Sequence, residues 1–493
     1  MEAKKPVDKK KNQKEELGIT VRKSDDLSEW YVQTVLKSEL ADYSVAKGFV
    51  VLRPYGYEIW EQIRNYFDLE IKKTGHRNAF FPTLIPESLL KREAEHFVGF
   101  VPEVFWVTHA GESELSEKFA VRPTSETIIH DSMRRWIRSW RDLPQLLNLW
   151  NSVLRAEIKS TKPFIRTSEF LWQEGHTAHA TEKEAEKEVM AQLFLYKKLM
   201  ESMIAVPVLV GKKSDKEKFV GAVYTTTLEA MMPDGRAVQM GTSHHLGQNF
   251  SKPFEIRFLG EDGEMHFVWQ TSWGISWRII GALILQHGDD KGLVLPPKIA
   301  PIQIVLIPIL FSSKDSEAIV TKCQELSSHF SDLGLRVQLD DRDNQTPGWK
   351  FNEWELKGVP LRVEIGPRDL SNNSATVVRR DTGVKEVVRF EELDKHVVET
   401  LDVVQQSLYK KSVDKLNAQT SESHSFEELS KLIGEKGGFV RAYWCGDGNC
   451  ETKVKESTGA DIRVIPFDQS PTSSKCMVCG EEAKYFVYFA RAY

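Results

Sequence analysis

Charged and aromatic side chains alternate along two neighbouring stretches of the sequence. The first stretch carries Arg155 and Glu157, and the second carries Phe170, Trp172 and Glu174. Residues two apart on a β-strand point to the same face, so each stretch would present its groups together. A guanidinium, two carboxylates and an aromatic wall can line one cavity, and such a cavity could clamp a nucleotide.

The segment between these stretches, residues 159–163, contains lysines, hydroxyl side chains and a proline. This composition suits a solvent-facing turn between two antiparallel strands. The sequence therefore predicts a β-hairpin whose first arm begins at residue 154 and whose second arm ends at residue 176.

Helical patterns flank the predicted hairpin. Apolar residues recur every four positions from Ile59 to Ile71, which predicts an amphipathic helix. A second helical pattern opens at Pro123, and Thr181 with Glu184 matches the capping box of a third helix. These helices supply the α part of a mixed fold.

Strand patterns supply the β part. Residues 205–270 form short alternating runs with a hairpin turn at 260–263, which predicts antiparallel sheet. An extended segment at 79–85 contains Pro82, which cannot donate to a strand ladder, so we expect it at a sheet edge or subunit contact. Together these patterns predict an α+β domain over residues 18–296.

The remaining chain divides into a leader and two further domains. From residue 297 the pattern alternates strand and helix, which is typical of a small α/β domain, here expected over 297–400. We expect a C-terminal domain over 401–493. Residues 1–17 carry six lysines, which predict a disordered basic leader, with an RNA-binding arm as the alternative.

The composition is that of an ordinary globular protein. The 493 residues and the 41% apolar content suggest about three domains with buried cores. The chain has 66 basic and 71 acidic residues, a net charge of -5. Any binding of nucleic acid would therefore need local basic surface.

No stretch of sequence predicts a membrane span or a secretory signal. The longest apolar stretch, residues 299–311, contains Pro301 and Pro308 and is shorter than the roughly 20 residues that cross a bilayer. We therefore expect a soluble, cytoplasmic protein.

Four of the five cysteines lie near the end of the sequence. Cys445 and Cys450 form one close pair, and Cys476 and Cys479 form another. Two such pairs favour a tetrahedral zinc site, and four thiolates leave no open position, so the site would be structural. The alternative is that the thiols are small apolar core residues.

Five short motifs, in order along the chain, resemble those of the prolyl-tRNA synthetases of the eukaryotic and archaeal type, a family of class II aminoacyl-tRNA synthetases. The motifs are residues 122–127 (Arg-Pro-Thr-Ser-Glu-Thr), the hairpin at 155–176, residues 241–248 (Gly-Thr-Ser-His-His-Leu-Gly-Gln), residues 272–274 (Ser-Trp-Gly) and residues 358–368. The resemblance implies an antiparallel class II catalytic core, an α/β anticodon-binding domain and a small zinc-binding α/β C-terminal domain.

The resemblance implies that the hairpin region binds ATP with Mg²⁺. Arg155 and Arg278 match arginines of two family motifs and are the implied catalytic residues, because they would hold the phosphates. The other implied ATP contacts are Glu157, Arg166, Thr167, Phe170, Gln239, Thr242 and Ser276. Alternatively, the arginines belong to structural ion pairs.

The resemblance also implies a pocket for L-proline beside the nucleotide. Glu126 and Glu174 would attract the cationic amine of proline. The other implied proline contacts are Thr124, Arg155, Trp172, His176, His244, Ser272 and Gly274. An isolated histidine is more often a neutral core residue, and His245 receives no assignment.

The implied reaction activates L-proline with ATP to prolyl-adenylate and pyrophosphate, then transfers the prolyl group to the 3′ end of tRNA(Pro) for translation. A homodimer is implied, and membership of a larger synthetase assembly stays open. Two alternatives are a threonyl-type class II synthetase and a catalytically silent paralogue. Residues 18–322 contain no cysteine for the core zinc of threonyl enzymes, and the presence of Arg155, Glu157 and Arg278 argues against a silent paralogue.

Overall fold

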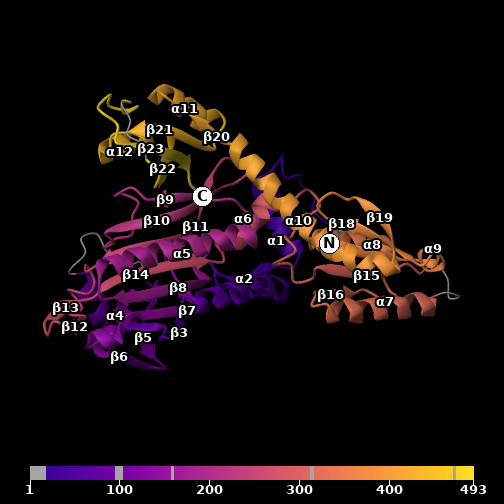
Figure 1. Ribbon diagram of the computed structural model, residues 1–493, viewed down its shortest axis with the longest axis horizontal. Coiled ribbons are helices and arrows are strands. Elements are labelled where there is room, and N and C mark those ends of the chain that lie inside the picture. The colour runs from indigo at the N-terminus through magenta and orange to yellow at the C-terminus, as the bar shows by residue number, and fades with distance from the viewer. Residues whose placement is uncertain (1–17, 95–103, 157–159, 311–315, 470–473) are drawn as a thin grey trace, which may run out of the picture.

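The computed structural model describes residues 18–94, 104–156, 160–310, 316–469 and 474–493. Glu157 and the basic leader at 1–17 therefore lie outside the described residues. Figure 1 shows three parts: an N-terminal body (α1 to α6), a middle unit (β15 to α10) and a C-terminal unit (β20 to β23).

One large sheet runs through the body and continues into the C-terminal unit. Its strand order is β20-β21-β23-β22-β9-β10-β11-β14-β8-β7-β3. Neighbouring strands are antiparallel, except that β3 is parallel to β7 and β20 to β21. The strands are β3 (Arg77–Asn78), β7 (Gln145–Leu154), β8 (Glu169–His179), β9 (Leu209–Lys212), β10 (Tyr224–Met231), β11 (Ala237–Gly247), β14 (Trp269–Ser276), β20 (Thr420–Glu422), β21 (Phe439–Trp444), β22 (Ala460–Pro466) and β23 (Tyr485–Arg491).

The helices of the body pack mainly on this sheet. They are α1 (Leu27–Lys37), α2 (Pro54–Lys73), α3 (Glu87–Ala94), α4 (Glu126–Trp136), the short 3-10 helix η1 (Trp140–Asp142), α5 (Glu182–Ser202) and α6 (Arg278–His287). On α2 the expected apolar positions, Ile59 to Ile71, are buried. Helix α5 begins with the expected capping box, since Thr181 and Glu184 bond each other's backbone N–H. Phe67 of α2 stacks on Tyr196 of α5 at 5.1 Å, which joins the two helices in one core.

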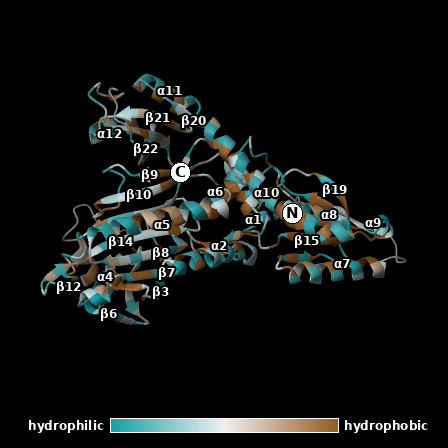
Figure 2. Cartoon of the chain, in the orientation of Figure 1, coloured by the Kyte–Doolittle hydropathy of each residue, from teal (hydrophilic) through white to brown (hydrophobic). Residues whose placement is uncertain are grey.

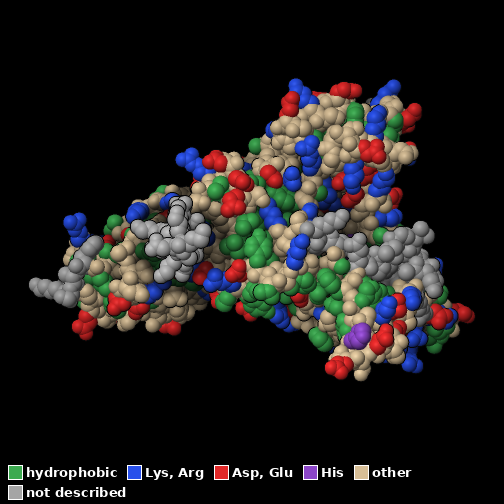
Figure 3. Space-filling model, turned by 180° about the vertical axis from the view of Figure 1, so that it is seen from behind, with side chains coloured by type: hydrophobic (Ala, Val, Ile, Leu, Met, Phe, Trp, Pro, Cys, Tyr) green, Lys and Arg blue, Asp and Glu red, His purple; other side chains and the backbone are tan. Residues whose placement is uncertain are grey.

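Three small sheets complete the body. The strands are β1 (Ala41–Tyr43) with β2 (Val50–Leu52), β4 (Leu84–Pro86) with β6 (Ser113–Val121) and β5 (Trp106–Ala110), and β12 (Arg257–Leu259) with β13 (Met265–Phe267). The β12–β13 pair forms the hairpin expected around residues 260–263. Seen from behind, hydrophobic side chains gather on the surface of the body (Figure 3). Large exposed hydrophobic residues of the body include Phe80, Leu84, Trp106 and Trp136.

The middle unit is a small α/β fold. A five-stranded sheet has the order β16-β15-β17-β18-β19, with the first three strands parallel. Its elements are β15 (Ile304–Pro308), α7 (Ser316–Asp332), β16 (Val337–Leu339), α8 (Pro347–Leu356), β17 (Leu361–Ile365), α9 (Pro367–Ser371), β18 (Ser374–Arg379), β19 (Lys385–Arg389) and α10 (Phe390–Ala418). Helix α7 mixes hydrophilic and hydrophobic residues (Figure 2), and it buries Ile319, Cys323, Leu326 and Phe330.

The C-terminal unit adds helices α11 (Phe426–Glu435) and α12 (Gly448–Thr458) to strands β20 to β23. Its strand β22 pairs with β9 of the body, where Ile465 lies opposite Lys212. A side chain at Gly211 would meet the Ile465 carbonyl oxygen at 2.2 Å, so glycine permits this close pairing. The C-terminal unit is therefore joined to the body by backbone hydrogen bonds.

Several boundaries differ from the sequence predictions. The helix predicted from Pro123 begins at Glu126, because Ser125 caps it with a non-helical backbone. The segment at 79–85 is not one strand: β3 ends before it, β4 begins within it at Leu84, and Pro82 lies in neither. The first arm of the hairpin is β7, which ends at Leu154, where the sequence predicted that the arm would begin, and the second arm, β8, begins at Glu169. The described part of the connection, residues 155–156 and 160–168, is therefore longer than the predicted turn.

The predicted α+β body followed by an α/β unit is confirmed. The domain limit expected at residue 400 falls inside α10, a single helix that runs from the middle unit towards β20. Within the described part of the chain, no helix has the length and apolar character needed to cross a bilayer.

Candidate active site

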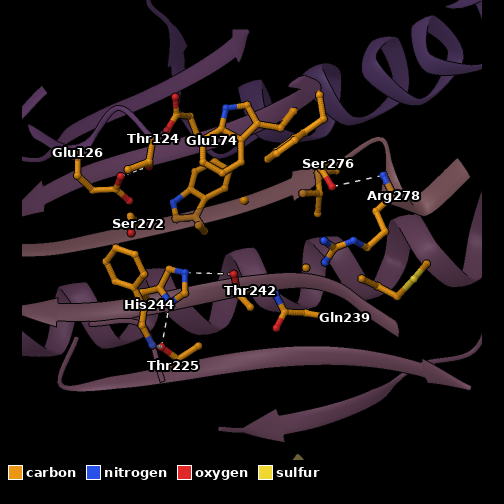
Figure 4. A pocket seen from close by; sticks show the side chains of 18 of the residues that line it. Thr124, Glu126, Glu174, Thr225, Gln239, Thr242, His244, Ser272, Ser276 and Arg278 are labelled. Atoms are coloured by element: carbon orange, nitrogen blue, oxygen red, sulfur yellow. Dashed lines mark hydrogen bonds between the residues drawn. The ribbon is translucent and has the colours of Figure 1, made fainter. Parts of the chain in front are cut away.

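Two neighbouring cavities open on one face of the large sheet, over β8, β11 and β14. Figure 4 shows side chains that line the first. The first has a volume of about 280 Å³ and the second about 250 Å³. Both are lined by Arg155, Phe170, Gln239, Ser276 and Arg278. The shared lining makes the two cavities one continuous cleft.

The structure gathers the predicted site residues in this cleft. The first cavity is also lined by Thr124, Glu126, Trp172, Glu174, His176, Thr242, His244, Ser272 and Gly274. The second cavity is also lined by Arg166 and Thr167. Every predicted ATP or proline contact therefore borders the cleft, except Glu157, which lies outside the described residues.

Strand alternation explains most of this lining. On β8, residues 170, 172, 174 and 176 border the first cavity, whereas Gln173 points to the opposite face and bonds Tyr196 of α5. The predicted common face of Phe170, Trp172 and Glu174 is therefore confirmed. Arg155 lies just beyond the end of β7, and its guanidinium lies 5.3 Å from the Phe170 ring centroid.

One end of the cleft is acidic. Glu174 is fully buried and accepts hydrogen bonds from the Ser125 hydroxyl, from Asn151 Nδ2 at 2.9 Å and from the Ser125 backbone N–H at 3.2 Å. Glu126 accepts a hydrogen bond from the Thr124 hydroxyl (Figure 4). The two carboxylates thus differ, because Glu174 is held by several protein donors and Glu126 by the hydroxyl of Thr124.

His176 lies between these acids. Its Nε2 is 3.0 Å from Glu174 Oε2. Burial opposes protonation, but the hydrogen bond to Glu174 and the charge of Glu126 outweigh it and raise the pKa of His176 above its ordinary value. Burial acts against ionisation of Glu174 too, yet His176 lowers the pKa of that carboxyl, so it stays ionised.

His244 forms another part of the wall. Its two ring nitrogens lie 2.9 Å from the Thr225 hydroxyl and 3.1 Å from the Thr242 hydroxyl (Figure 4). Burial lowers the pKa of His244 to about 3, with a smaller effect from His176, so the ring is neutral. His245, the next residue on β11, is absent from the lining and stacks on Tyr224.

The other end of the cleft is basic. The second cavity is lined by Arg155, Arg166, Arg278 and Arg463. Burial, and then the charge of Arg155, lowers the pKa of Arg278 to about 10, so it is still charged at neutral pH. Among the described residues, no carboxylate forms an ion pair with Arg278. Arg463 pairs with the buried Glu229, and the surplus positive charge of Arg278 beside it suits a polyanion such as a triphosphate.

The sequence did not reveal several lining residues. Glu217 and Phe219 lie in the loop between β9 and β10, and Arg463 comes from β22 of the C-terminal unit. None belongs to a recognisable motif, and the long-range pairing of β22 with β9 brings Arg463 to the cleft. Met240 lines the first cavity and is buried in the main core.

The four C-terminal cysteines meet in space. Their sulfur atoms all lie within 4.8 Å of one another, and Cys445 Sγ is 3.7 Å from both Cys450 Sγ and Cys479 Sγ. Tetrahedral zinc with bonds of about 2.3 Å to sulfur would separate the sulfurs by about 3.8 Å. The four residues therefore fit a zinc ion.

Three family models match the chain. They are described as tRNA synthetase class II core domain (G, H, P, S and T) over residues 105–287, anticodon binding domain over 303–400, and prolyl-tRNA synthetase, C-terminal, over 426–493. The models divide the chain in the same order as the body, the middle unit and the C-terminal unit.

Curated relatives match over nearly their full length. A proline--tRNA ligase of Cenarchaeum symbiosum (strain A) is 55% identical over 477 residues, covering 97% of this chain and 100% of the relative. One of Alkaliphilus oremlandii (strain OhILAs) is 51% identical over 468 residues, covering 95% and 96%. One of Natranaerobius thermophilus is 50% identical over 485 residues, covering 98% and 100%. With these matches and the cleft described above, the chain belongs to the prolyl-tRNA synthetase family of class II aminoacyl-tRNA synthetases.

Proposed function

We propose that the chain is a proline--tRNA ligase. It activates L-proline with ATP to prolyl-adenylate and pyrophosphate, and then transfers the prolyl group to the 3′ end of tRNA(Pro). The observation that carries this proposal is a single cleft that is acidic and aromatic at one end and basic at the other. A cationic imino acid fits the first end, and a triphosphate fits the second.

The basic end is the proposed ATP site. Arg155 lies between the two cavities, so its planar guanidinium can bridge the α-phosphate and the proline carboxylate. Arg278 approaches the phosphates from α6, and Phe170 offers a flat face to the adenine. The further proposed ATP contacts are Glu157, Arg166, Thr167, Gln239, Thr242 and Ser276.

The acidic end is the proposed proline site. Glu126 accepts a hydrogen bond from the proline amine, while Glu174 supplies a second negative charge that its own donors hold in place. Trp172, His176 and His244 form walls around the pyrrolidine ring. Thr124, Ser272 and Gly274 complete the proposed contacts, together with Arg155.

The proposed chemistry uses orientation and charge and needs no side-chain nucleophile. The proline carboxylate attacks the α-phosphorus of ATP, pyrophosphate leaves, and the arginines offset the charge that builds up on the phosphate oxygens. Mg²⁺ supplies further charge neutralisation on the phosphates, and Gln239, which borders both cavities, would contact ATP or this ion. The 3′-terminal ribose hydroxyl of the tRNA then attacks the prolyl carbonyl carbon, the bond from that carbon to the phosphate oxygen breaks, and AMP and the hydroxyl proton leave.

The test of this function is ATP–pyrophosphate exchange with each amino acid in turn. We expect exchange with proline, because the cleft places an amine partner beside the arginines. Exchange with threonine but not proline would indicate a threonyl-type enzyme. A folded protein with no exchange for any amino acid would indicate a silent paralogue.

We further propose that Cys445, Cys450, Cys476 and Cys479 hold a structural Zn²⁺. The ion would fix α12 and the loop that carries Cys476 and Cys479. Metal analysis of the purified protein is expected to give about one zinc per chain.

Replacing Cys450 with serine is expected to remove most of this zinc and lower the melting temperature. The matched control is Cys323→Ala, since Cys323 lies in α7 of the middle unit and should leave the zinc content unchanged. Full stability of metal-free protein would contradict the zinc site.

Other features support coarser proposals about partners and organisation. We propose a cytoplasmic homodimer, because the body exposes Phe80, Leu84, Trp106 and Trp136, which a second copy could cover. Sedimentation that finds only monomer at working concentration would exclude the dimer.

The middle unit would bind the anticodon of tRNA(Pro). Arg342 of this unit lies 5.1 Å from the Trp349 ring centroid and could stack with a base. The proposed division is a catalytic domain at 18–296, an anticodon-binding domain at 297–400 and a zinc domain at 401–493.

A further inference from the structure

One loop contacts both the proposed proline pocket and the C-terminal unit. Residues 213–223 join β9 to β10, and Glu217 and Phe219 of this loop line the first cavity but not the second. The same loop contacts α12, the helix whose first turn contains Cys450. The loop therefore contacts both the first cavity and the helix that carries Cys450.

The strongest contact between the loop and α12 is buried. The Ser214 hydroxyl donates to Glu451 Oε1 at 2.6 Å, and both residues are almost fully excluded from solvent. A buried carboxylate that loses its donor is costly, so this hydrogen bond holds the start of the loop against the helix.

Two further residues of α12 reach the loop at the surface. The Lys216 ammonium donates to the Thr452 hydroxyl. The Lys455 ammonium lies 3.4 Å from Glu217 Oε1 and 2.8 Å from Asp461 Oδ1 at the start of β22. Glu217, which lines the cavity, is thus held directly by the C-terminal unit.

A buried ion cluster fixes the end of β9, where the loop begins. Lys213 Nζ donates to Glu229 Oε1 at 2.6 Å, and Arg463 of β22 donates to the same carboxylate at 2.9 to 3.1 Å. All three residues are buried. The C-terminal unit therefore contacts the loop at its start through Arg463 and along its length through α12.

On the pocket side, the loop meets the histidine wall. The Phe219 backbone N–H donates to the Thr225 hydroxyl at 2.9 Å, and that hydroxyl also lies 2.9 Å from His244 Nδ1. The Phe219 and His244 ring centroids are 4.7 Å apart. A shift of the loop would therefore move both Phe219 and the partner of His244.

We propose that α12 is a positioning element for the amino-acid pocket. Ser214, Glu451 and Lys455 are positioning residues: they hold the loop so that Glu217 and Phe219 close the wall of the first cavity. This inference rests on the proposed function. Glu217 and Phe219 do not line the second cavity. Loosening the contacts between α12 and the loop at 213–223 should therefore weaken proline binding and leave ATP binding nearly unchanged.

The test compares two variants of the full chain that each lose a contact between α12 and the loop with a control variant on the same helix. In ATP–pyrophosphate exchange, Ser214→Ala is expected to raise KM for proline about 5- to 20-fold, and Lys455→Met about two- to threefold. KM for ATP should change less than about twofold in both. The control is Lys453→Met, which removes the same charge from α12, but whose ammonium lies over the Phe426 ring and not over the loop.

Two measurements separate positioning from a general loss of structure. Zinc content and melting temperature of Lys455→Met should match those of the control, because Lys455 is largely exposed. Calorimetric binding of a non-hydrolysable prolyl-adenylate analogue should weaken in Ser214→Ala, and Ser214→Thr, which keeps the hydroxyl, should restore part of it.

The outcomes distinguish this inference from the proposed function. If the unaltered protein exchanges with proline but Ser214→Ala and Lys455→Met both keep its KM for proline, the positioning role is wrong. If the KM values for proline and ATP rise equally, it is also wrong, because the loop would then act on the whole cleft. If the unaltered protein shows no exchange with proline, the proposed function itself fails.

Discussion

Replacing Arg278 with glutamine is expected to lower the rate of prolyl-adenylate formation by about 10²- to 10³-fold, the usual effect of losing one preorganised charge at a reacting phosphate. Arg278 lines both cavities beside Arg155 and forms no ion pair with the described residues. Its charge is therefore available to the triphosphate. Single-turnover formation of adenylate, measured at saturating proline and ATP, provides the rate.

The same substitution should not destabilise the folded protein. Arg278 lies among Arg155, Arg166 and Arg463, and removal of one of several crowded positive charges relieves repulsion. We expect a melting temperature equal to or above that of the unaltered protein. Arg257→Gln, on the surface hairpin of β12, is the matched control and should change neither rate nor stability. An unchanged rate in Arg278→Gln would exclude Arg278 from the phosphate site.

Replacing Glu126 with glutamine is expected to raise KM for proline by about 100-fold, because the imino acid loses a buried charge partner. KM for ATP should change only about two- to threefold, since Glu126 lines the first cavity and not the second. Exchange kinetics with each substrate varied in turn measure both constants. Equal weakening of both substrates would contradict the assignment of this acidic end to proline.

Glu174→Gln provides an informative comparison. Glu174 accepts hydrogen bonds from Ser125, Asn151 and His176, so an amide there would leave donors without acceptors. We expect this variant to lose stability as well as proline affinity, whereas Glu126→Gln should lose mainly affinity. Glu255→Gln, an exposed acid of the body, serves as the neutral control.

The sequence predicted the features that depend on local patterns. The common face of Phe170, Trp172 and Glu174 follows from strand alternation, and the start of α5 follows from the capping box of Thr181 and Glu184. The family motifs predicted most of the residues that line the cleft, which the amino-acid composition alone could not have done.

Features that depend on tertiary contacts were missed or misplaced. Pro123 is a reasonable first residue for a helix, but Ser125 has a non-helical backbone and α4 begins only at Glu126, which borders the cleft, and no local rule favours this later start. The sequence could not distinguish the roles of Glu126 and Glu174, because their difference depends on donors to Glu174 from Asn151 of β7 and from Ser125, the N-cap residue of α4. Arg463 borders the cleft because β22 pairs with β9, and no sequence signal marks that pairing.

The pairing of β22 with β9 has a consequence for how the protein reaches its native state. These strands are far apart in the chain, with the whole middle unit between them, so their association closes a very long loop and should be a late, slow step of folding. Until then β9 is an unprotected sheet edge, which can pair with other chains and favours aggregation. Conditions that delay this closure should therefore lower the yield of refolded protein, even when the middle unit has already formed.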